Sequence, residues 1–366
     1  MKYIFTIIVL LHALIHLLGF LSSFALKEVK ELTLPISKPA GLFWLTAAVL
    51  FLIFGVLYFC NNKYSWLVGF TAIALSQVLI IAFWQDAKFG TLLNIIILVL
   101  SIMTFEGYTF QKRVLKETSD ILSQCNLSTG KVITENDIAN LPEPVKKWLR
   151  SSGVIGKPYI TAGRVTQLAA LKMKPDQQKW MNATALQYTT IDNPAFIWTV
   201  DVKMNSLLRF AGRDKFHNGK GAMLIKLNSL FTVVDEKGEK LDEGTIQRYL
   251  GEMVWFPTLA LSQYVTWEQL DLTTAQANIE YKGTRGSGTF YFNSSGEFSK
   301  FVALRYMGNQ PDAKRNEWVL LVDEYKTFEG IKVPAKMTAT WKLAGGDWTW
   351  LKLEITDIRY NENAYH

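Results

Sequence analysis

The sequence predicts a membrane α-helical bundle of four transmembrane helices followed by a β-rich α+β domain, a large curved antiparallel sheet or half-barrel with one main covering helix. Three observations predict this fold class. Four long apolar stretches fill the first 110 residues, apolar and polar residues alternate from Tyr159 onward, and a single later stretch has helical spacing. We therefore expect a four-helix transmembrane anchor over 1–110, a linker over 111–140 and an antiparallel β-domain over 141–366.

The four apolar stretches are 3–26, 41–60, 66–84 and 92–108. Each is close to the roughly 20 residues that a helix needs to cross the hydrocarbon core of a bilayer. A cleaved signal peptide is the alternative for the first stretch, because Lys2 precedes it and small residues stand near 23–25. Its apolar run is, however, longer than the roughly 7 to 15 residues usual in such peptides. Aromatic residues typical of membrane interfaces stand near the ends of the stretches: Tyr3, Trp44, Tyr58, Trp66, Trp84 and Tyr108.

The short loops between these stretches differ little in positive charge. An even number of spans places both ends of the bundle on one side of the membrane, and the basic cluster at 112–116 favours a cytoplasmic β-domain. That side carries five basic residues, and the other carries four: Lys2, Lys63, Lys112, Arg113 and Lys116 against Lys27, Lys30, Lys38 and Lys88.

His12 and His16 lie one helical turn apart in the middle of the first apolar stretch. A polar side chain at this depth marks a functional site or a polar contact between helices. Gln77 lies about as deep in the third stretch, with Ser76 beside it. We expect an intramembrane polar network of His12, His16 and Gln77, with a hydrogen bond from His16 to Gln77; a site for a polar small molecule, a quinone head group or a proton is the alternative.

A haem or a metal ion does not fit the two histidines. A bis-histidine haem needs rings from different helices on opposite sides of the iron, and no other apolar stretch contains a His. A metal ion needs further ligands, and no Asp, Glu or Cys stands at this depth. Cys60 and Cys125 show no zinc-binding spacing. We therefore expect no metal and no cofactor.

The linker is polar and leads into a short helix. Thr134 opens a capping pattern, and LPEPVKKWLRSSG places Val145, Trp148 and Leu149 on one helical face, with Gly153 suited to end the helix.

Two segments show the alternation of half-buried strands most clearly: PAFIWTVDVKM at 194–204 and AKMTATWKL at 335–343. The main helix is expected at about 242–254, where Ile246, Tyr249, Leu250 and Met253 have helical spacing before Pro257. Turn sequences such as DEKG and NSSG fit antiparallel hairpins. Further strands are expected at 159–173, 179–190, 207–216, 221–233, 274–282, 285–293, 298–307, 317–327 and 348–360.

Nine of the twelve tryptophans lie in the β-domain, and one helix cannot cover so large an apolar face. Curved β-structures commonly bind apolar ligands at their mouths. We predict a membrane-tethered, non-catalytic binding protein that holds an acyl-chain or lipoprotein-like ligand and contacts membrane lipids. The alternative is a structural or partner-binding module whose core is filled by its own side chains. The predicted ligand-binding residues are Trp198, Arg248, Glu252, Trp255, Arg305 and Trp341.

Catalytic motifs do not stand out. The sequence has no GxSxG, phosphate-binding loop or HExxH motif, and GTRGSGTF at 283–290 fits a hairpin. His217 stands in a turn, where an exposed ring is expected. A hydrolase that uses Arg248, Glu252 and Asp323 is a second alternative. The net charge of +7 forms no basic block with interleaved aromatics, so we expect no nucleic-acid partner.

Four motifs between about Leu141 and Asn361 are distinctive: LPEPVKKWLRSSGVIGKP, GKGAMLIKL, RYLGEMVWFP and ITDIRYN. They resemble one uncharacterised bacterial domain family whose members often follow membrane segments. The segments ISKPAGLFWL and FWQDAKFGTLLNIIIL resemble the four-helix anchors found in front of that domain. The resemblance implies no catalytic residue, and the layout is similar to the envelope lipoprotein-carrier fold, a half-barrel with a helix in its mouth. It implies a multi-pass protein of the bacterial inner membrane with an extracytoplasmic β-domain, contrary to the loop charges.

Overall fold

The computed structural model describes residues 2–127, 130–205 and 208–362. The chain forms two compact units. One contains Met1–Arg113 with Asn228–Phe231, and the other contains Val114–Leu227 with Thr232–His366.

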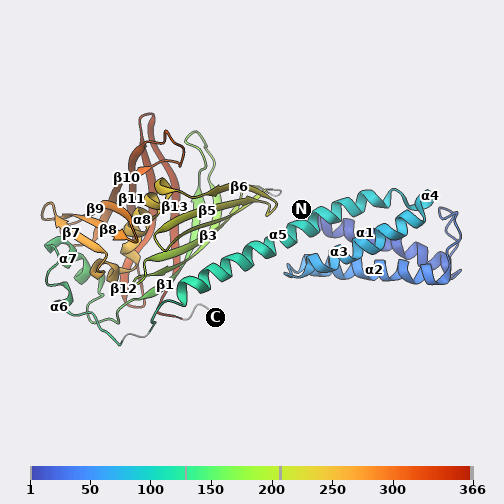
Figure 1. The fold of residues 1–366 in the computed structure, drawn as a ribbon, viewed down its shortest axis with the longest axis horizontal. Coiled ribbons are helices and arrows are strands. Elements are labelled where there is room, and N and C mark those ends of the chain that lie inside the picture. The colour runs from blue at the N-terminus through green and yellow to red at the C-terminus, as the bar shows by residue number, and fades with distance from the viewer. Residues whose placement is uncertain (1, 128–129, 206–207, 363–366) are drawn as a thin grey trace. The chain divides into compact units, whose positions relative to one another are not determined.

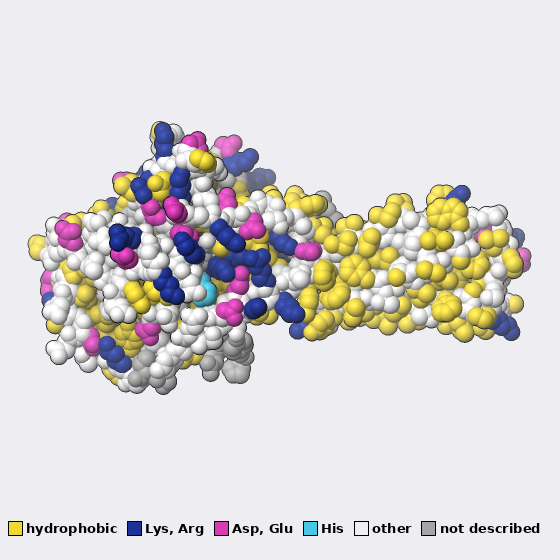
Figure 2. Space-filling model, in the orientation of Figure 1, with side chains coloured by type: hydrophobic (Ala, Val, Ile, Leu, Met, Phe, Trp, Pro, Cys, Tyr) yellow, Lys and Arg dark blue, Asp and Glu magenta, His cyan; other side chains and the backbone are white. Residues whose placement is uncertain are grey.

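The first unit is helical, and Figure 1 shows its long helices side by side. It contains α1 (Lys2–Ser23), α2 (Lys38–Phe59), α3 (Ser65–Ala82), α4 (Trp84–Ala87) and the first part of α5 (Gly90–Leu122). The start of α2 shows why the sequence folds this way: Ser37 accepts a hydrogen bond from the Ala40 amide, and Pro39 stands in the first turn. α1, α2, α3 and α5 are long and apolar enough to cross a membrane, and hydrophobic side chains cover the face shown in Figure 2.

α5 is longer than the predicted apolar stretch at 92–108. It continues to Leu122, so the first part of the predicted linker is helical. In the second unit, Val114 and Ile121 of this helix pack against Ala195 and Ile197 of the sheet. Their helical spacing is the sequence signal for this extension.

Two short helices precede the sheet. α6 (Glu135–Ile138) begins with the predicted capping box between Thr134 and Asp137. α7 (Glu143–Ser152) ends at Gly153, whose φ of 74° lies in the left-handed region that glycine tolerates.

The second unit is dominated by one thirteen-stranded sheet, whose strand order is β6-β5-β4-β3-β2-β1-β13-β12-β11-β10-β9-β8-β7. Neighbouring strands run antiparallel in every pair for which the described residues give a register. The fold class predicted from sequence is confirmed. The strands are β1 (Ala162–Leu171), β2 (Met181–Thr190), β3 (Ala195–Lys203), β4 (Arg209–His217), β5 (Lys220–Leu227), β6 (Phe231–Glu236), β7 (Val265–Gln269), β8 (Thr274–Tyr281), β9 (Thr284–Phe292), β10 (Phe298–Tyr306), β11 (Arg315–Phe328), β12 (Ile331–Leu343) and β13 (Gly346–Tyr360).

The sheet curls around α8 (Glu239–Gly251). This helix contacts β4 and β5 near one end of the strand order and β8, β9 and β10 near the other, which only a strongly curved sheet permits (Figure 1). Two 3₁₀ helices follow it, η1 (Glu252–Trp255) and η2 (Pro257–Leu261). The α-helix therefore begins and ends about three residues before the predicted 242–254.

Two strand predictions need correction. The stretch at 221–233 is two strands, because Asn228 and Ser229 adopt positive φ and lie in the turn that joins β5 to its neighbour β6. β7 is too short to show a clear alternation and was not expected.

Candidate ligand-binding cavity

A cavity of about 280 Å³ lies between α8 and the concave face of the sheet. The helix contributes Leu241, Gly244, Arg248 and Gly251 to its lining. All six predicted ligand-binding residues line this one cavity: Trp198, Arg248, Glu252, Trp255, Arg305 and Trp341.

Five tryptophans form much of the cavity wall, since Trp318 and Trp350 join the three that were predicted. The Trp198 indole donates to Gln167 Oε1 at 2.9 Å, and the Trp255 indole donates to the Pro334 carbonyl at 3.1 Å. The indole nitrogens of Trp318 and Trp350 have no hydrogen-bond partner within the described ranges. The wall is therefore largely apolar with a few polar points, as in small-molecule sites.

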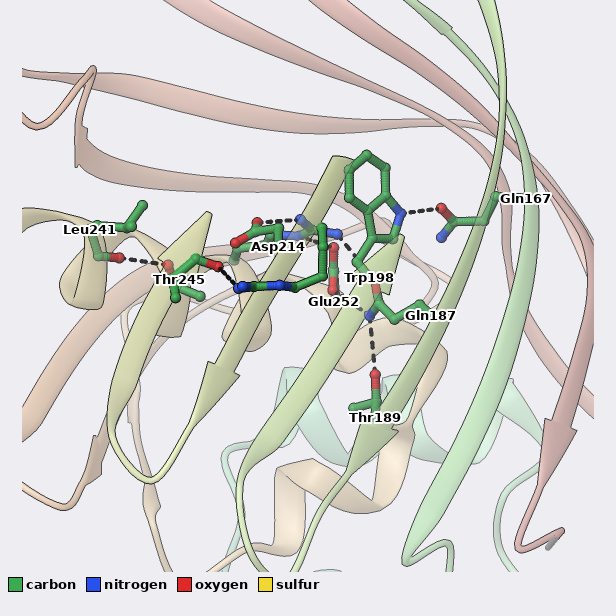
Figure 3. Close-up of polar contacts among 11 residues, drawn as sticks. Gln167, Gln187, Thr189, Trp198, Asp214, Leu241, Thr245 and Glu252 are labelled. Atoms are coloured by element: carbon green, nitrogen blue, oxygen red, sulfur yellow. Dashed lines mark hydrogen bonds and ion pairs between the residues drawn. The ribbon is translucent and has the colours of Figure 1, made fainter. Parts of the chain in front are cut away.

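Each of the three guanidinium nitrogens of Arg248 donates a hydrogen bond to a neighbouring side chain. Its Nε donates to Glu252 Oε1 at 2.7 Å, its Nη1 to Asp214 Oδ2 at 2.7 Å and its Nη2 to Gln187 Oε1 at 3.0 Å. The Gln187 amide nitrogen donates in turn to Glu252 Oε2 at 2.7 Å. Figure 3 shows Asp214 of β4, Glu252 of η1 and Gln187 of β2 close to one another.

The two carboxylates also set the charge of Arg248. Burial disfavours the cation, but Glu252 and Asp214 outweigh it and raise the pKa of the guanidinium. The rings of Phe196 and Trp198 lie against it, each centroid 4.8 Å from Cζ. Arg248 therefore stays protonated and is held in one place.

Arg305 on β10 has a different environment. Its guanidinium lies 4.2 Å from the centroid of Trp318 and 5.7 Å from that of Trp341. Among the described residues no carboxylate lies within ion-pair distance, and the solvent-inaccessible Nε has no hydrogen-bond partner. Burial, and then the charge of Arg248, lower the pKa of Arg305 to about 10, so the side chain remains a cation at neutral pH.

Asp323, the third residue of the predicted hydrolase site, is exposed and lies outside the cavity. The structure thus brings Arg248 and Glu252 together but places Asp214 beside them instead. Sequence reasoning missed Asp214, although the alternation along β4 gives a signal: Asp214 shares a face with Phe216, which is fully buried.

Two of the three glycines of GTRGSGTF serve packing, and the third serves a turn. A Cβ on Gly286 would lie 2.8 Å from Ile246 of α8, and one on Gly288 would lie 2.2 Å from the Phe301 ring. Gly283, with a φ of 81°, forms the turn before β9.

In the helical unit His12 and His16 are buried and belong to a polar network, but the expected partner of His16 is corrected. His16 Nε2 pairs with Ser76 Oγ at 2.8 Å and not with Gln77. His12 Nε2 pairs with Asn94 Oδ1 at 2.9 Å, and Asn94 Nδ2 donates to Gln77 Oε1 at 3.0 Å. Asn94 in α5 was not predicted as a member of this network, because it lies within a long apolar stretch. The described residues contain no cluster of three His, Cys, Asp or Glu able to hold a metal ion.

Comparisons with known proteins give one family and a distant structural likeness. The model of a family of unknown function, DUF6544, matches residues 131–353, which confirms the resemblance seen in the motifs. No curated protein matches the chain. The crystal structure of a LolA superfamily protein from Nitrosomonas europaea is similar with a TM-score of 0.34 and 8% identity, over 64% of this chain and 96% of that one.

Proposed function

Since the chain belongs to DUF6544, a family of unknown function, we propose its function from its own cavity: the β-domain binds a single-chain, lipid-like ligand, and the four apolar helices anchor it in a bacterial inner membrane. The observation that carries the proposal is the cavity under α8, lined by five tryptophans and closed by a helix.

The size of the cavity selects the class of ligand. At about 280 Å³ it is slightly smaller than most small-molecule sites, which run from about 300 to 1,000 Å³. One acyl chain suits this space better than the several chains of a lipoprotein anchor. We therefore narrow the expected lipid-like or lipoprotein-like ligand to a single-chain amphiphile.

Burial of the chain supplies the affinity. About ten methylene groups gain roughly 8 kcal/mol at about 0.8 kcal/mol each, against an association cost of at least about 4 kcal/mol. A membrane anchor compensates for modest affinity, because it keeps the domain at high effective concentration near membrane lipids.

Photolabelling of the full chain in lipid nanodiscs tests the proposal. A dodecanoate that carries a terminal diazirine is added, crosslinked by light and mapped by peptide mass spectrometry. We expect crosslinks on cavity peptides of β3, β12 and β13, besides those on the apolar helices, which serve as an internal reference for probe in the bilayer.

A matched pair of variants separates cavity binding from surface adsorption. Leu353→Trp adds a ring inside the cavity, whereas Leu304→Trp makes the same change at an exposed position on β10. We expect loss of cavity crosslinks in the first variant and wild-type crosslinks in the second. Equal labelling of both variants, or labelling of the helices alone, would overturn the proposal in favour of a self-filled core.

A further inference from the structure

We infer that the ligand is an anionic amphiphile and that Arg305 binds its carboxylate or phosphate head group beside Trp318 and Trp341. This inference rests on the proposed function, because it assumes that the cavity holds the chain. It goes further in naming the charge of the ligand and the residue that recognises it.

The first argument is the contrast between the two cavity arginines. Arg248 donates to Glu252, Asp214 and Gln187 and therefore has little capacity left for a ligand. Arg305 lines the same cavity, yet within the described ranges it has ring contacts only. Of the two predicted binding arginines, Arg305 is the one whose donors are available.

The second argument is the cost of this arrangement. The Nε of this half-buried side chain is inaccessible to water and donates no hydrogen bond, an arrangement that costs stability unless another group satisfies it. Asp214 and Glu252 favour its charge from beyond ion-pair distance but accept no hydrogen bond from it. A ligand carboxylate or phosphate supplies the missing acceptors, and a guanidinium binds both groups in bidentate fashion.

The third argument is the space around the guanidinium. Arg305 approaches α8 at Gly244, where an added Cβ would lie 3.2 Å from Nη2. Gly244 thus allows the charge to lie beside the helix backbone, and Trp318 covers one face of the guanidinium. A head group held here has its chain next to the apolar wall formed by Leu320, Met337 and Leu353.

The test compares probes of equal chain length in full-chain nanodiscs. Diazirine-bearing dodecanoate and dodecanol are titrated separately, and the cavity crosslinks are normalised to those of the apolar helices. We expect half-saturation by the carboxylate at about tenfold lower concentration, as a charge-assisted hydrogen bond implies. Arg305→Gln should abolish this difference and Arg305→Lys should retain part of it, whereas Arg285→Gln, which removes an exposed arginine on β9, should leave it unchanged.

The outcomes separate the two proposals. Cavity labelling by both probes with equal affinity would overturn the head-group assignment and leave the proposed function standing. If neither probe labels the cavity, both the head-group assignment and the proposed function are overturned. A diazirine dodecylamine that binds better than the carboxylate would also overturn the assignment.

Competition identifies the source of the anion. Unlabelled dodecyl phosphate should displace the carboxylate probe, whereas inorganic phosphate at the same concentration should not. Equal displacement by inorganic phosphate would overturn the assignment to an amphiphile and indicate a site for the free anion. Melting curves of the Arg305 variants show whether each remains folded.

Discussion

Arg248 joins α8 to the sheet through charge. Its side chain is 15% exposed, and its two acidic partners, Asp214 and Glu252, are at most 10% exposed. Removal of one partner from a buried ion pair leaves the others uncompensated, which typically costs about 3–5 kcal/mol. The contribution of Arg248 is therefore mainly structural.

We expect Arg248→Met to lower the Tm of the β-domain by about 6–20 °C, at about 2–4 °C per kcal/mol for a domain of this size. Thermal unfolding of the full chain in nanodiscs, followed by tryptophan fluorescence, measures this. Arg285→Met is the matched control, because its pair with Glu280 is exposed to solvent and such surface pairs contribute little to stability. A Tm within 2 °C of wild type for Arg248→Met would contradict the structural role.

His217 gives the β-domain a pH dependence. Burial, followed by the charges of Lys215 and Lys282, lowers the pKa of its ring, while Asp120 and Glu117 act in the opposite direction. The ring is half-buried, and not exposed as expected from its turn. Because the unfolded chain binds the proton more readily, this group costs stability as pH falls below the unfolded pKa of about 6.5.

We therefore expect the Tm to fall less steeply between pH 7 and pH 5 in His217→Asn than in wild type. Melting curves at several pH values measure the slope. A slope identical to that of wild type would show that other groups cause the acid sensitivity.

At the scale of elements, α8 packs closely on the sheet because small residues face it. A Cβ on Gly286 of β9 would lie 2.8 Å from Ile246 and 3.3 Å from the backbone nitrogen of Gln247. A Cβ on Gly221 of β5 would lie 3.0 Å from the Leu241 carbonyl. The glycines on these two strands therefore determine how close α8 lies to the sheet, and hence the size of the cavity between them.

Gly286→Val should displace α8 and lower the Tm by about 2–12 °C, since overpacking costs about 1–3 kcal/mol. The cavity crosslinks described above should fall in the same variant. Gly345→Val is the control, because a Cβ at Gly345 meets nothing within 4 Å. Unchanged melting and crosslinking in Gly286→Val would show that the helix position does not depend on this glycine.

The sequence reveals these elements unequally, for physical reasons. The strands at 194–204 and 335–343 are readable because one face is apolar and the other polar. The C-terminal end of α5 is harder to predict, since only a few of its residues pack against the sheet and they lie among charged residues. The cavity residues on α8 can be anticipated from composition, whereas the different environments of Arg248 and Arg305 depend on which strands the curvature brings opposite each other.

At the scale of the whole molecule, four apolar helices imply a definite topology. If α1, α2, α3 and α5 all cross the membrane, the loop between α2 and α3 lies on the same side as the β-domain. The loop between α3 and α5 then lies on the opposite side. This relation holds whichever side faces the cytoplasm, so it is independent of the near-equal loop charges.

Cysteine labelling tests this topology. Exposed Cys60 reports on the loop between α2 and α3, Lys88→Cys on the loop between α3 and α5, and Lys237→Cys on the β-domain. Each is studied as the only cysteine of its chain, with Ser in place of Cys125 and, in the last two variants, also of Cys60. In sealed vesicles of one orientation, a membrane-impermeant maleimide should label Cys60 and the cysteine at 237 together and spare the one at 88. Vesicles of the opposite orientation should reverse the pattern, because only the side facing the reagent changes. Labelling of all three positions in one orientation would mean that neither α3 nor α5 crosses the membrane, and the β-domain would then lack a four-helix anchor.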